Sequence, residues 1–168
     1  VNGVLCLAAA AASAGMREIY VPKDNAKEAS VVRGITVYGV DSIITLVRHL
    51  RGEELIEPTH FDESLFSGQE YASELDFYDV LGQQSAKRAL EIAAAGGHNI
   101  LMLGTPGSGK SMLAKRLPSI LPDMSFDEAL EITKIHSVAG TLGSEGIIVE
   151  RPFRSPHHTA TTVSLCGG

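Results

Sequence analysis

One octapeptide limits what this chain can fold into more than any other part of the sequence. Residues 104–111 read GTPGSGKS and fit the pattern G-x-x-x-x-G-K-[ST]. Glycines let a backbone wrap closely around phosphate oxygens, so that successive N–H groups and the start of a following helix face the anion. In such a loop the lysine reaches the β- and γ-phosphates, and the hydroxyl after it ligates Mg²⁺.

The pattern therefore predicts a site for ATP and Mg²⁺, with Lys110 as the catalytic cation and Ser111 as the metal ligand. The expected nucleotide-binding residues of the loop are Gly104, Thr105, Pro106, Gly107, Ser108, Gly109, Lys110 and Ser111. The reading as a plain glycine-rich turn is disfavoured by the elements expected on either side.

Those flanking segments have the order that a phosphate loop needs. Residues 83–95 are rich in helix formers, residues 99–103 read NILML and predict a strand, and residues 110–121 predict a helix bent near Pro118. Strand, loop and helix follow one another. A further helix is expected over residues 125–135.

Capping residues support that further helix, because Ser125 is a good N-cap and Glu128 follows three residues later. Residues 140–168 are glycine-rich, and there we expect loops and a hairpin. The acid pair that such ATPases use on a second strand is not evident. Only Glu150, after the apolar residues 147–149, is a candidate, so we expect that pair, a sensor residue and an arginine finger beyond residue 168.

The first 57 residues follow a different pattern. Helix formers fill residues 5–14, strands are expected at 18–21 and 35–38, and Asp41 precedes an apolar helical stripe that Gly52 ends. The stripe consists of Ile43, Ile44, Leu46, Val47 and Leu50. Residues 58–78 are acidic and weakly periodic, which indicates a solvated linker.

Charge and cysteine content limit the binding partners and the cell compartment that we expect. The formal net charge of -6 gives no overall attraction to nucleic acid or membrane, so DNA binding would need a local basic patch. The apolar start, residues 1–14, is too short to span a bilayer and predicts a buried helix. Cys6 and Cys166 have no metal-site spacing, and we interpret both as reduced thiols of a cytoplasmic protein. Both ends look cut inside larger units.

Four further segments carry a resemblance to a known family. They are DVLGQ (79–83), GHN (97–99), IHSVAG (135–140) and RPFRSPHHT (151–159). Together with the loop they resemble the magnesium chelatase-like AAA+ ATPases of the YifB/ComM group. The resemblance implies an α/β fold, a partial P-loop AAA+ module of three αβα layers over residues 79–168, hexameric rings with ATP between subunits, and Val80 and Leu81 against the adenine.

A second resemblance covers the N-terminal part. AGM (14–16) followed by IYVPKDN (19–25) is similar to the closing segment of a Lon-type protease domain, which implies a Lon/S5-like α+β domain over residues 1–57. Lon-type proteolysis needs a Ser–Lys pair, and the Lon pattern puts the lysine position at Leu5. Leucine cannot act as a base, so we expect this domain to be an inactive scaffold.

The sequence favours two functions over the others. The first is an ATP-driven DNA motor, because the ComM-like resemblance implies a ring helicase for branch migration. The second is a chelatase-type motor subunit that acts on a protein partner. An ATP-dependent protease is disfavoured by Leu5, and a non-hydrolysing nucleotide-binding module stays open. This stretch of chain alone is expected to be inactive as an ATPase.

A basic segment near the end of the chain bears on this choice. Arg151, Arg154, His157 and His158 stand between and beside Pro152 and Pro156. They fit a DNA-facing or inter-subunit contact, or a structural hairpin whose backbone the prolines fix. The two adjacent histidines are poor metal ligands without a third nearby.

Overall fold

The computed structural model describes residues 1–62, 75–143, 146–157, 159–161 and 163. The chain forms two compact units, Val1–Glu70 with Met124–Glu150, and Tyr71–Asp123 with Arg151–Gly168. Residues 124–150 thus group with the N-terminal elements, whereas the sequence suggested one continuous module from residue 79. The domain boundaries expected from the sequence stay a prediction.

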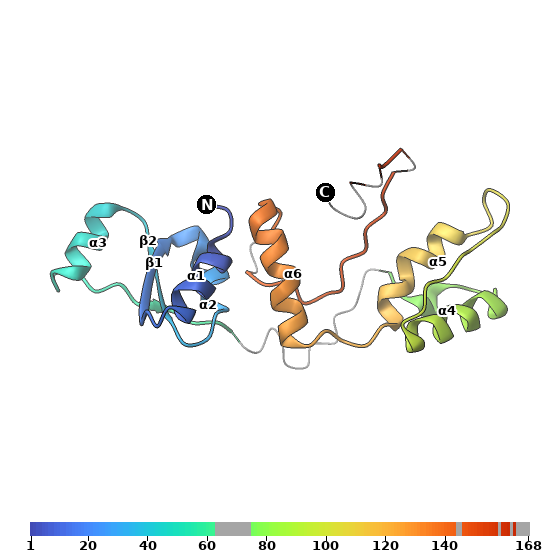
Figure 1. Ribbon diagram of the computed structural model, residues 1–168, viewed down its shortest axis with the longest axis horizontal. Helices are drawn as coiled ribbons and strands as arrows, with labels where there is room; N and C mark the ends of the chain where they lie inside the picture. Colours follow the sequence, from blue (N-terminus) through green and yellow to red (C-terminus); the bar gives the residue numbers. More distant parts are fainter. Residues whose placement is uncertain (63–74, 144–145, 158, 162, 164–168) are drawn as a thin grey trace. The chain divides into compact units, whose positions relative to one another are not determined.

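A small mixed sheet organises the first unit (Figure 1). Strand β1 (Glu18–Pro22) pairs in parallel with β2 (Thr36–Val40), and β3 (Pro58–Thr59) adds to β2 in antiparallel orientation. The predicted strands at 18–21 and 35–38 are confirmed to within two residues. The short β3 lies in the predicted linker, where two residues give no periodic signal.

Two helices cover this sheet. Helix α1 (Val4–Ser13) agrees with the helix expected at 5–14, and α2 (Ala26–Ser30) forms the crossover between the parallel strands. The sequence did not predict α2, because five residues are too few to show a helical period. Small residues bring the crossover close to β2. A Cβ on Gly39 would stand 2.9 Å from the Cβ of Ala26, so only glycine fits there.

Helix α3 (Ile43–Leu50) has Ser42 as its N-cap, one residue after the predicted cap. Ser42, with an extended backbone, accepts a hydrogen bond from the Thr45 N–H at 3.2 Å, while the expected cap Asp41 pairs with Lys23 instead. The predicted apolar stripe exists, but its side chains are not buried by the residues that the structure describes; Ile43 and Leu50 are 77% and 65% exposed.

Aromatic rings hold α3 on the sheet. Tyr20 and Tyr38 are neighbours in the β1–β2 register, and their rings stack with centroids 5.2 Å apart. The His49 ring of α3 lies 4.9 Å from the ring of Tyr38.

Burial and the hydrogen bond with Glu18 raise the pKa of the Tyr20 hydroxyl.

Helix α6 (Phe126–Ala139) packs against α1 in the same unit. The predicted capping box is confirmed, since the Ser125 hydroxyl accepts from the Glu128 N–H at 3.2 Å and the Glu128 carboxylate accepts from the Ser125 N–H at 2.8 Å. The helix runs four residues beyond the expected end. Its core cluster consists of Leu5, Val31, Met124, Ala129 and Ile147.

The second unit contains α4 (Gln84–Gly96) and α5 (Lys110–Arg116), which a 3-10 turn at Leu117–Ile120 continues. The bend predicted near Pro118 is confirmed by this turn. One core cluster joins the segment before α4 to both helices: Phe77, Val80, Leu90 and Leu113.

Two predicted β elements are absent from the described residues. Residues 99–103 are extended but pair with no strand there, and Leu101 and Leu103 are 81% and 85% exposed. A strand in the interior of a sheet hydrogen-bonds to a neighbouring strand along each edge. The described residues of the second unit contain no other strand that could pair with residues 99–103. The hairpin expected within 140–168 is likewise not formed by residues 146–157.

The described elements therefore show an α/β fold with a small mixed sheet. None of their helices combines the length and the apolar character that crossing a bilayer requires.

Candidate phosphate-binding site

Residues 104–109 of the octapeptide form a loop after the extended segment 99–103, and its last two residues begin α5. Gly107 and Gly109 have φ values of 81° and 86°, in the left-handed region that glycine adopts without strain. A Cβ on Gly104 would stand 2.9 Å from the Ser108 hydroxyl, so a side chain there would displace that hydroxyl from its position beside Lys110. The glycines predicted from the pattern thus have geometric roles.

Lys110 turns back over this loop. Its ammonium donates to the carbonyl oxygens of Gly104 and Thr105, each at 2.8 Å, and to the Ser108 hydroxyl at 3.1 Å. All three partners are neutral oxygens. Because charge-assisted bonds to phosphate are stronger, an anion at the loop would compete well for this ammonium.

The start of α5 adds further donors. The first N–H groups of a helix have no acceptor inside it, and they carry the positive end of the helix dipole. Lys110 and Ser111 are the first two residues of α5, and Ser111 is exposed. Its hydroxyl oxygen suits Mg²⁺, which takes few protein ligands and keeps several waters. No cluster of three or more His, Cys, Asp or Glu side chains suited to a metal is found among the described residues.

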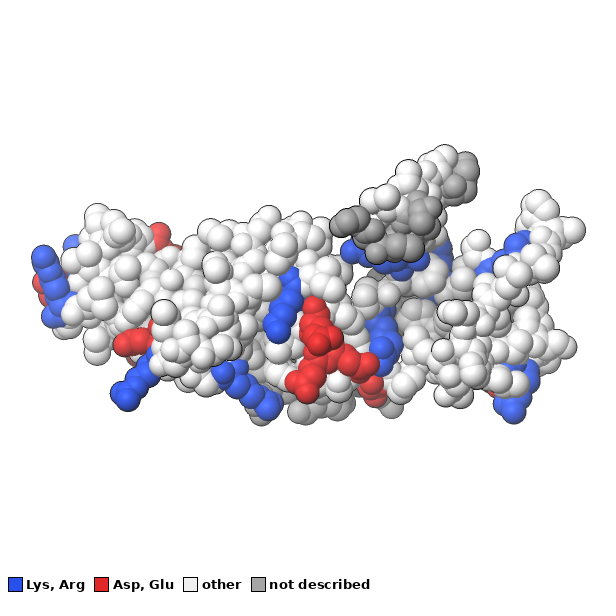
Figure 2. All heavy atoms as spheres, viewed as in Figure 1, with Lys and Arg blue, Asp and Glu red and all other residues white. Residues whose placement is uncertain are grey.

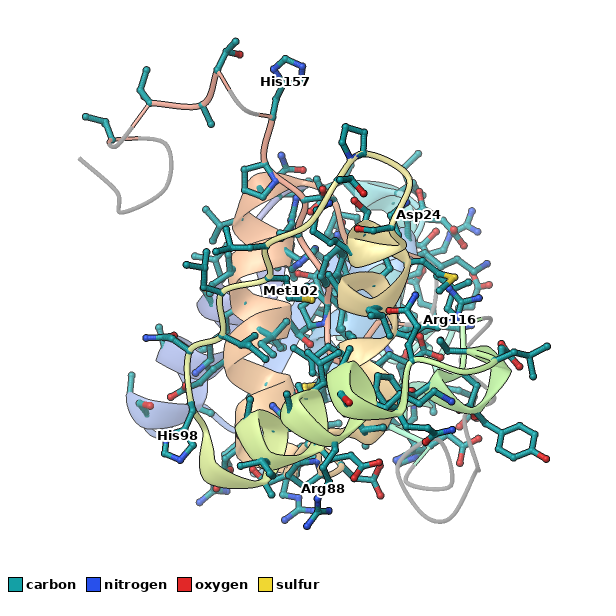
Figure 3. All side chains as sticks on the ribbon, turned by 90° about the vertical axis from the view of Figure 1, so that its right-hand side faces the viewer. Asp24, Arg88, His98, Met102, Arg116 and His157 are labelled. Atoms are coloured by element: carbon teal, nitrogen blue, oxygen red, sulfur yellow. The ribbon has the colours of Figure 1, made fainter. Side chains whose placement is uncertain are left out.

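A cavity of about 400 Å³ lies beside the loop, within the size range of small-molecule sites. Its walls include Gln83, Ala86, Leu90, Met102, Gly104 and Lys110. Met102 lies on the extended segment and turns its side chain toward α5, whereas His98, just after α4, points outward (Figure 3). One side of the cavity is therefore apolar, and the other carries the loop and its ammonium.

The structure separates the two residues expected against adenine. Val80 is buried in the core cluster at 2% exposure, and Leu81 is 92% exposed. Neither lines the cavity. Of the pair, only Leu81 has an exposed side chain, and the adenine contact stays a prediction.

Arg116, labelled in Figure 3, fixes the segment that precedes these two residues. Its Nε donates to the Asp76 carbonyl at 3.0 Å, and its guanidinium lies 3.9 Å from the Asp79 carboxylate. The Ser119 hydroxyl accepts from the Phe77 N–H at 2.9 Å. The end of α5 and the 3-10 turn after it thus hold the turn at residues 76–79 by side-chain contacts that the sequence did not reveal.

The predicted basic segment has one anchored and one exposed arginine. Arg151 donates from Nε to the Pro122 carbonyl at 2.7 Å, while the Arg154 side chain is exposed. His157 Nδ1 lies 2.8 Å from the Thr159 hydroxyl, and His158 is outside the described residues. On the face drawn in Figure 2, the described Lys and Arg side chains lie in several small groups.

The position predicted for the Lon-type lysine lies in the core of the first unit. Leu5 is fully buried, and its N–H donates to the Glu28 carboxylate at 3.0 Å. Its surroundings are mainly apolar: Val31, Met124, Ala129 and Ile147. The leucine thus fills a packed interior, where a lysine ammonium would be desolvated.

Sequence reasoning missed the role of one residue at the loop. Gln83 donates from Nε2 to the Ser108 carbonyl at 3.2 Å. The two residues are 25 positions apart, so no local pattern could have shown the bond. The only signal was that Gln83 ends the motif DVLGQ.

Comparisons with known proteins agree with the motifs. A sequence profile of the family described as Magnesium chelatase, subunit ChlI, matches residues 76–168. The whole chain is 42% identical to the Competence protein ComM of Haemophilus influenzae, over 33% of that protein, and 38% identical to the Uncharacterized protein YifB of Escherichia coli, over 32% of it.

A partial match covers another class. A stretch of 51 residues, 30% of the chain, is 39% identical to the Archaeal Lon protease of Halobacterium salinarum. The stretch covers 7% of that protease. The chain spans about a third of the length of the curated relatives that match it throughout.

Proposed function

The chain belongs to the magnesium chelatase-like AAA+ ATPases of the YifB/ComM family, and from this premise we propose that it is the nucleotide-binding part of an ATP-driven motor. The observation that carries the proposal is the Lys110 ammonium, held over the glycine loop by three neutral oxygens within 3.1 Å. A cation in this position, beside the N–H groups at the start of α5, favours the phosphates of ATP.

Each residue of the loop would bind a different part of ATP and Mg²⁺. Lys110 would exchange its loop oxygens for β- and γ-phosphate oxygens, and the N–H groups at the start of α5 would face the same anion. Ser111 would hold Mg²⁺, which when bound neutralises charge on the transferring phosphoryl group. Leu81 is the exposed candidate for contact with the base.

Assembly forms part of the same proposal. We propose a hexameric ring of three-layer αβα AAA+ modules with ATP between neighbouring subunits, acting in the cytoplasm. The extended segment 99–103 would then be a strand of that module, which explains its two highly exposed leucines in this chain. The N-terminal unit would serve as a scaffold, since a core leucine stands at the Lon-type lysine position.

The 168-residue chain alone is expected to show no ATP hydrolysis above background. Phosphoryl transfer needs an acid that holds the metal, a group that orients water and stabilisation of the developing charge, and only the phosphate loop is evident here. The measurement is phosphate release by the purified chain beside its Lys110→Ala variant. Turnover that depends on Lys110 would contradict this and would mean that Glu150 or another acidic residue of this chain is the acid.

For the substrate of the motor we propose branched DNA. The ComM resemblance implies a branch-migration helicase, and the Lon-like segment ahead of the ATPase part accompanies that resemblance. The second candidate is a motor that acts on a protein partner, as in metal chelatases, and it is favoured by the family match over residues 76–168.

ATPase rates of the full-length protein separate these two candidates. We expect stimulation by a four-way DNA junction and a smaller effect of linear duplex at equal phosphate concentration. A rate that no DNA changes, at low salt and with assembly verified by sizing, would reject the DNA motor in favour of the protein partner.

Arg154 is expected to contribute to DNA binding in the full-length ring. Its side chain is exposed, and each phosphate contact that is lost makes the negative slope of log affinity against log salt shallower by about one. A salt titration of Arg154→Ala beside the parent measures this. Arg88→Ala is the matched control, because Arg88 is an exposed arginine paired with Glu91 on α4.

Arg151 separates the DNA contact from a structural role. Its Nε already binds the Pro122 carbonyl, so Arg151→Ala is expected to disturb the segment itself. If Arg154→Ala leaves affinity and slope unchanged while ring assembly is lost, the segment is an inter-subunit element and the DNA contact is rejected.

A further inference from the structure

Gln83 is the one described residue with a side chain whose backbone lies in the left-handed region. Its φ is 52°, and every other described residue with a positive φ is a glycine. The left-handed region costs free energy for a residue with a Cβ, so surrounding contacts must hold Gln83 there. Gln83 is also the N-cap residue of α4, yet its side chain caps no helical N–H.

The Gln83 side chain instead reaches the phosphate loop. Its Nε2 donates to the Ser108 carbonyl at 3.2 Å, and a Cβ on Gly109 would stand 3.0 Å from the same nitrogen. The carboxamide therefore lies against the peptide unit between Ser108 and Gly109. Because a trans peptide is planar, a bond that fixes the Ser108 carbonyl also fixes the Gly109 N–H, which points the opposite way.

Both partners of this bond rest on one core cluster. Val80, three residues before Gln83, packs with Leu90 of α4 and Leu113 of α5, and both Val80 and Leu113 are 2% exposed. Gln83 also lines the cavity beside the loop together with Lys110. The exposed carboxamide thus links the start of α4 to the turn that leads into α5 by one hydrogen bond.

We propose that Gln83 is a positioning residue for the bound phosphates: its carboxamide orients the Ser108–Gly109 peptide so that the loop presents its N–H groups to the anion. The inference rests on the proposed nucleotide binding and deepens it. Gln83 acts through the peptide and does not itself touch phosphate. The strained backbone is what aims the carboxamide at Ser108.

The test uses the full-length protein and the fluorescent nucleotide mant-ATP. Gln83→Met keeps the length of the side chain but removes the donor, and Gln83→Gly removes the side chain while its φ suits glycine. One hydrogen bond predicts an affinity about three- to tenfold weaker in both variants. KM for ATP should rise by a similar factor, with a smaller change in kcat. Gln84→Met, at the exposed neighbouring residue, is the control.

Melting temperature distinguishes positioning from a merely structural role. Gln83→Gly relieves the left-handed strain, so we expect its melting temperature to stay equal or rise while its affinity falls. Affinity that falls only together with melting temperature in both variants would overturn the proposal. Parent-like affinity in Gln83→Met would also overturn the proposal if Lys110→Ala abolishes binding. That outcome would leave the proposed nucleotide binding intact. A parent that binds no mant-ATP would overturn the proposed function itself.

Discussion

Replacing Lys110 with alanine in the full-length protein is expected to lower kcat/KM for ATP by on the order of 100-fold or more, because the cation that meets the developing phosphoryl charge is removed. The Lys110 ammonium makes three hydrogen bonds in the loop, all to loop oxygens. Its loss should leave the fold intact, since these partners are exposed to water and can be solvated.

Steady-state ATP hydrolysis and mant-ATP titration measure this effect. Lys115→Ala is the matched control, because Lys115 is an exposed lysine on the same helix α5, and it should behave as the parent. A Lys110→Ala variant whose turnover stays within twofold of the parent, with an unchanged melting temperature, would refute the assignment of this loop. A fall in both variants would indicate a general effect of charge on α5.

Local signals account for what the sequence predicted well. The phosphate loop needs only consecutive residues, and the capping box at Ser125 and Glu128 spans a single turn. The helices α1, α4 and α6 are long enough to show composition or periodicity. Such features are decided within a few residues, and tertiary contacts only adjust their ends.

Pairing and packing over long separations account for the rest. Residues 99–103 have strand composition, but a strand forms only when another strand pairs with it. The described residues of the second unit contain no such strand. The hydrogen bond from Gln83 to Ser108 spans 25 positions, and that from Arg116 to Asp76 spans 40. The partner of a polar side chain over such separations cannot be read from sequence patterns, so the contacts around the loop were missed.

Glu28 is a third residue whose side chain bonds to partners far away in sequence. We expect its replacement to have the largest effect on stability. Its side chain is buried at 7% exposure and joins three elements. The carboxylate accepts from the Leu5 N–H at 3.0 Å, from the Ser137 hydroxyl of α6, and from Asn25 Nδ2 at 3.1 Å. One buried anion therefore satisfies a donor at the start of α1 and a donor on α6, which are far apart in sequence.

Glu28→Ala is expected to destabilise the contact between α1 and α6 by about 2–4 kcal/mol, because the buried Leu5 N–H and Ser137 hydroxyl lose their acceptor. Hydrogen–deuterium exchange in the full-length protein measures local opening without a two-state assumption. Peptides that cover α1 and α6 should exchange roughly 30- to 1000-fold faster, by the conversion of 1.4 kcal/mol per tenfold.

Two further variants locate the effect in the buried acceptor. Glu28→Gln keeps a carbonyl oxygen that can accept from both Leu5 and Ser137, so its exchange should lie between the parent and Glu28→Ala. Glu131→Ala removes an exposed carboxylate from α6 and should exchange as the parent does. If Glu28→Ala exchanges no faster than Glu131→Ala, water satisfies the two donors and the carboxylate does not hold α1 to α6. If Glu28→Gln is as fast as Glu28→Ala, the negative charge is needed, because a neutral acceptor is too weak for two donors at once.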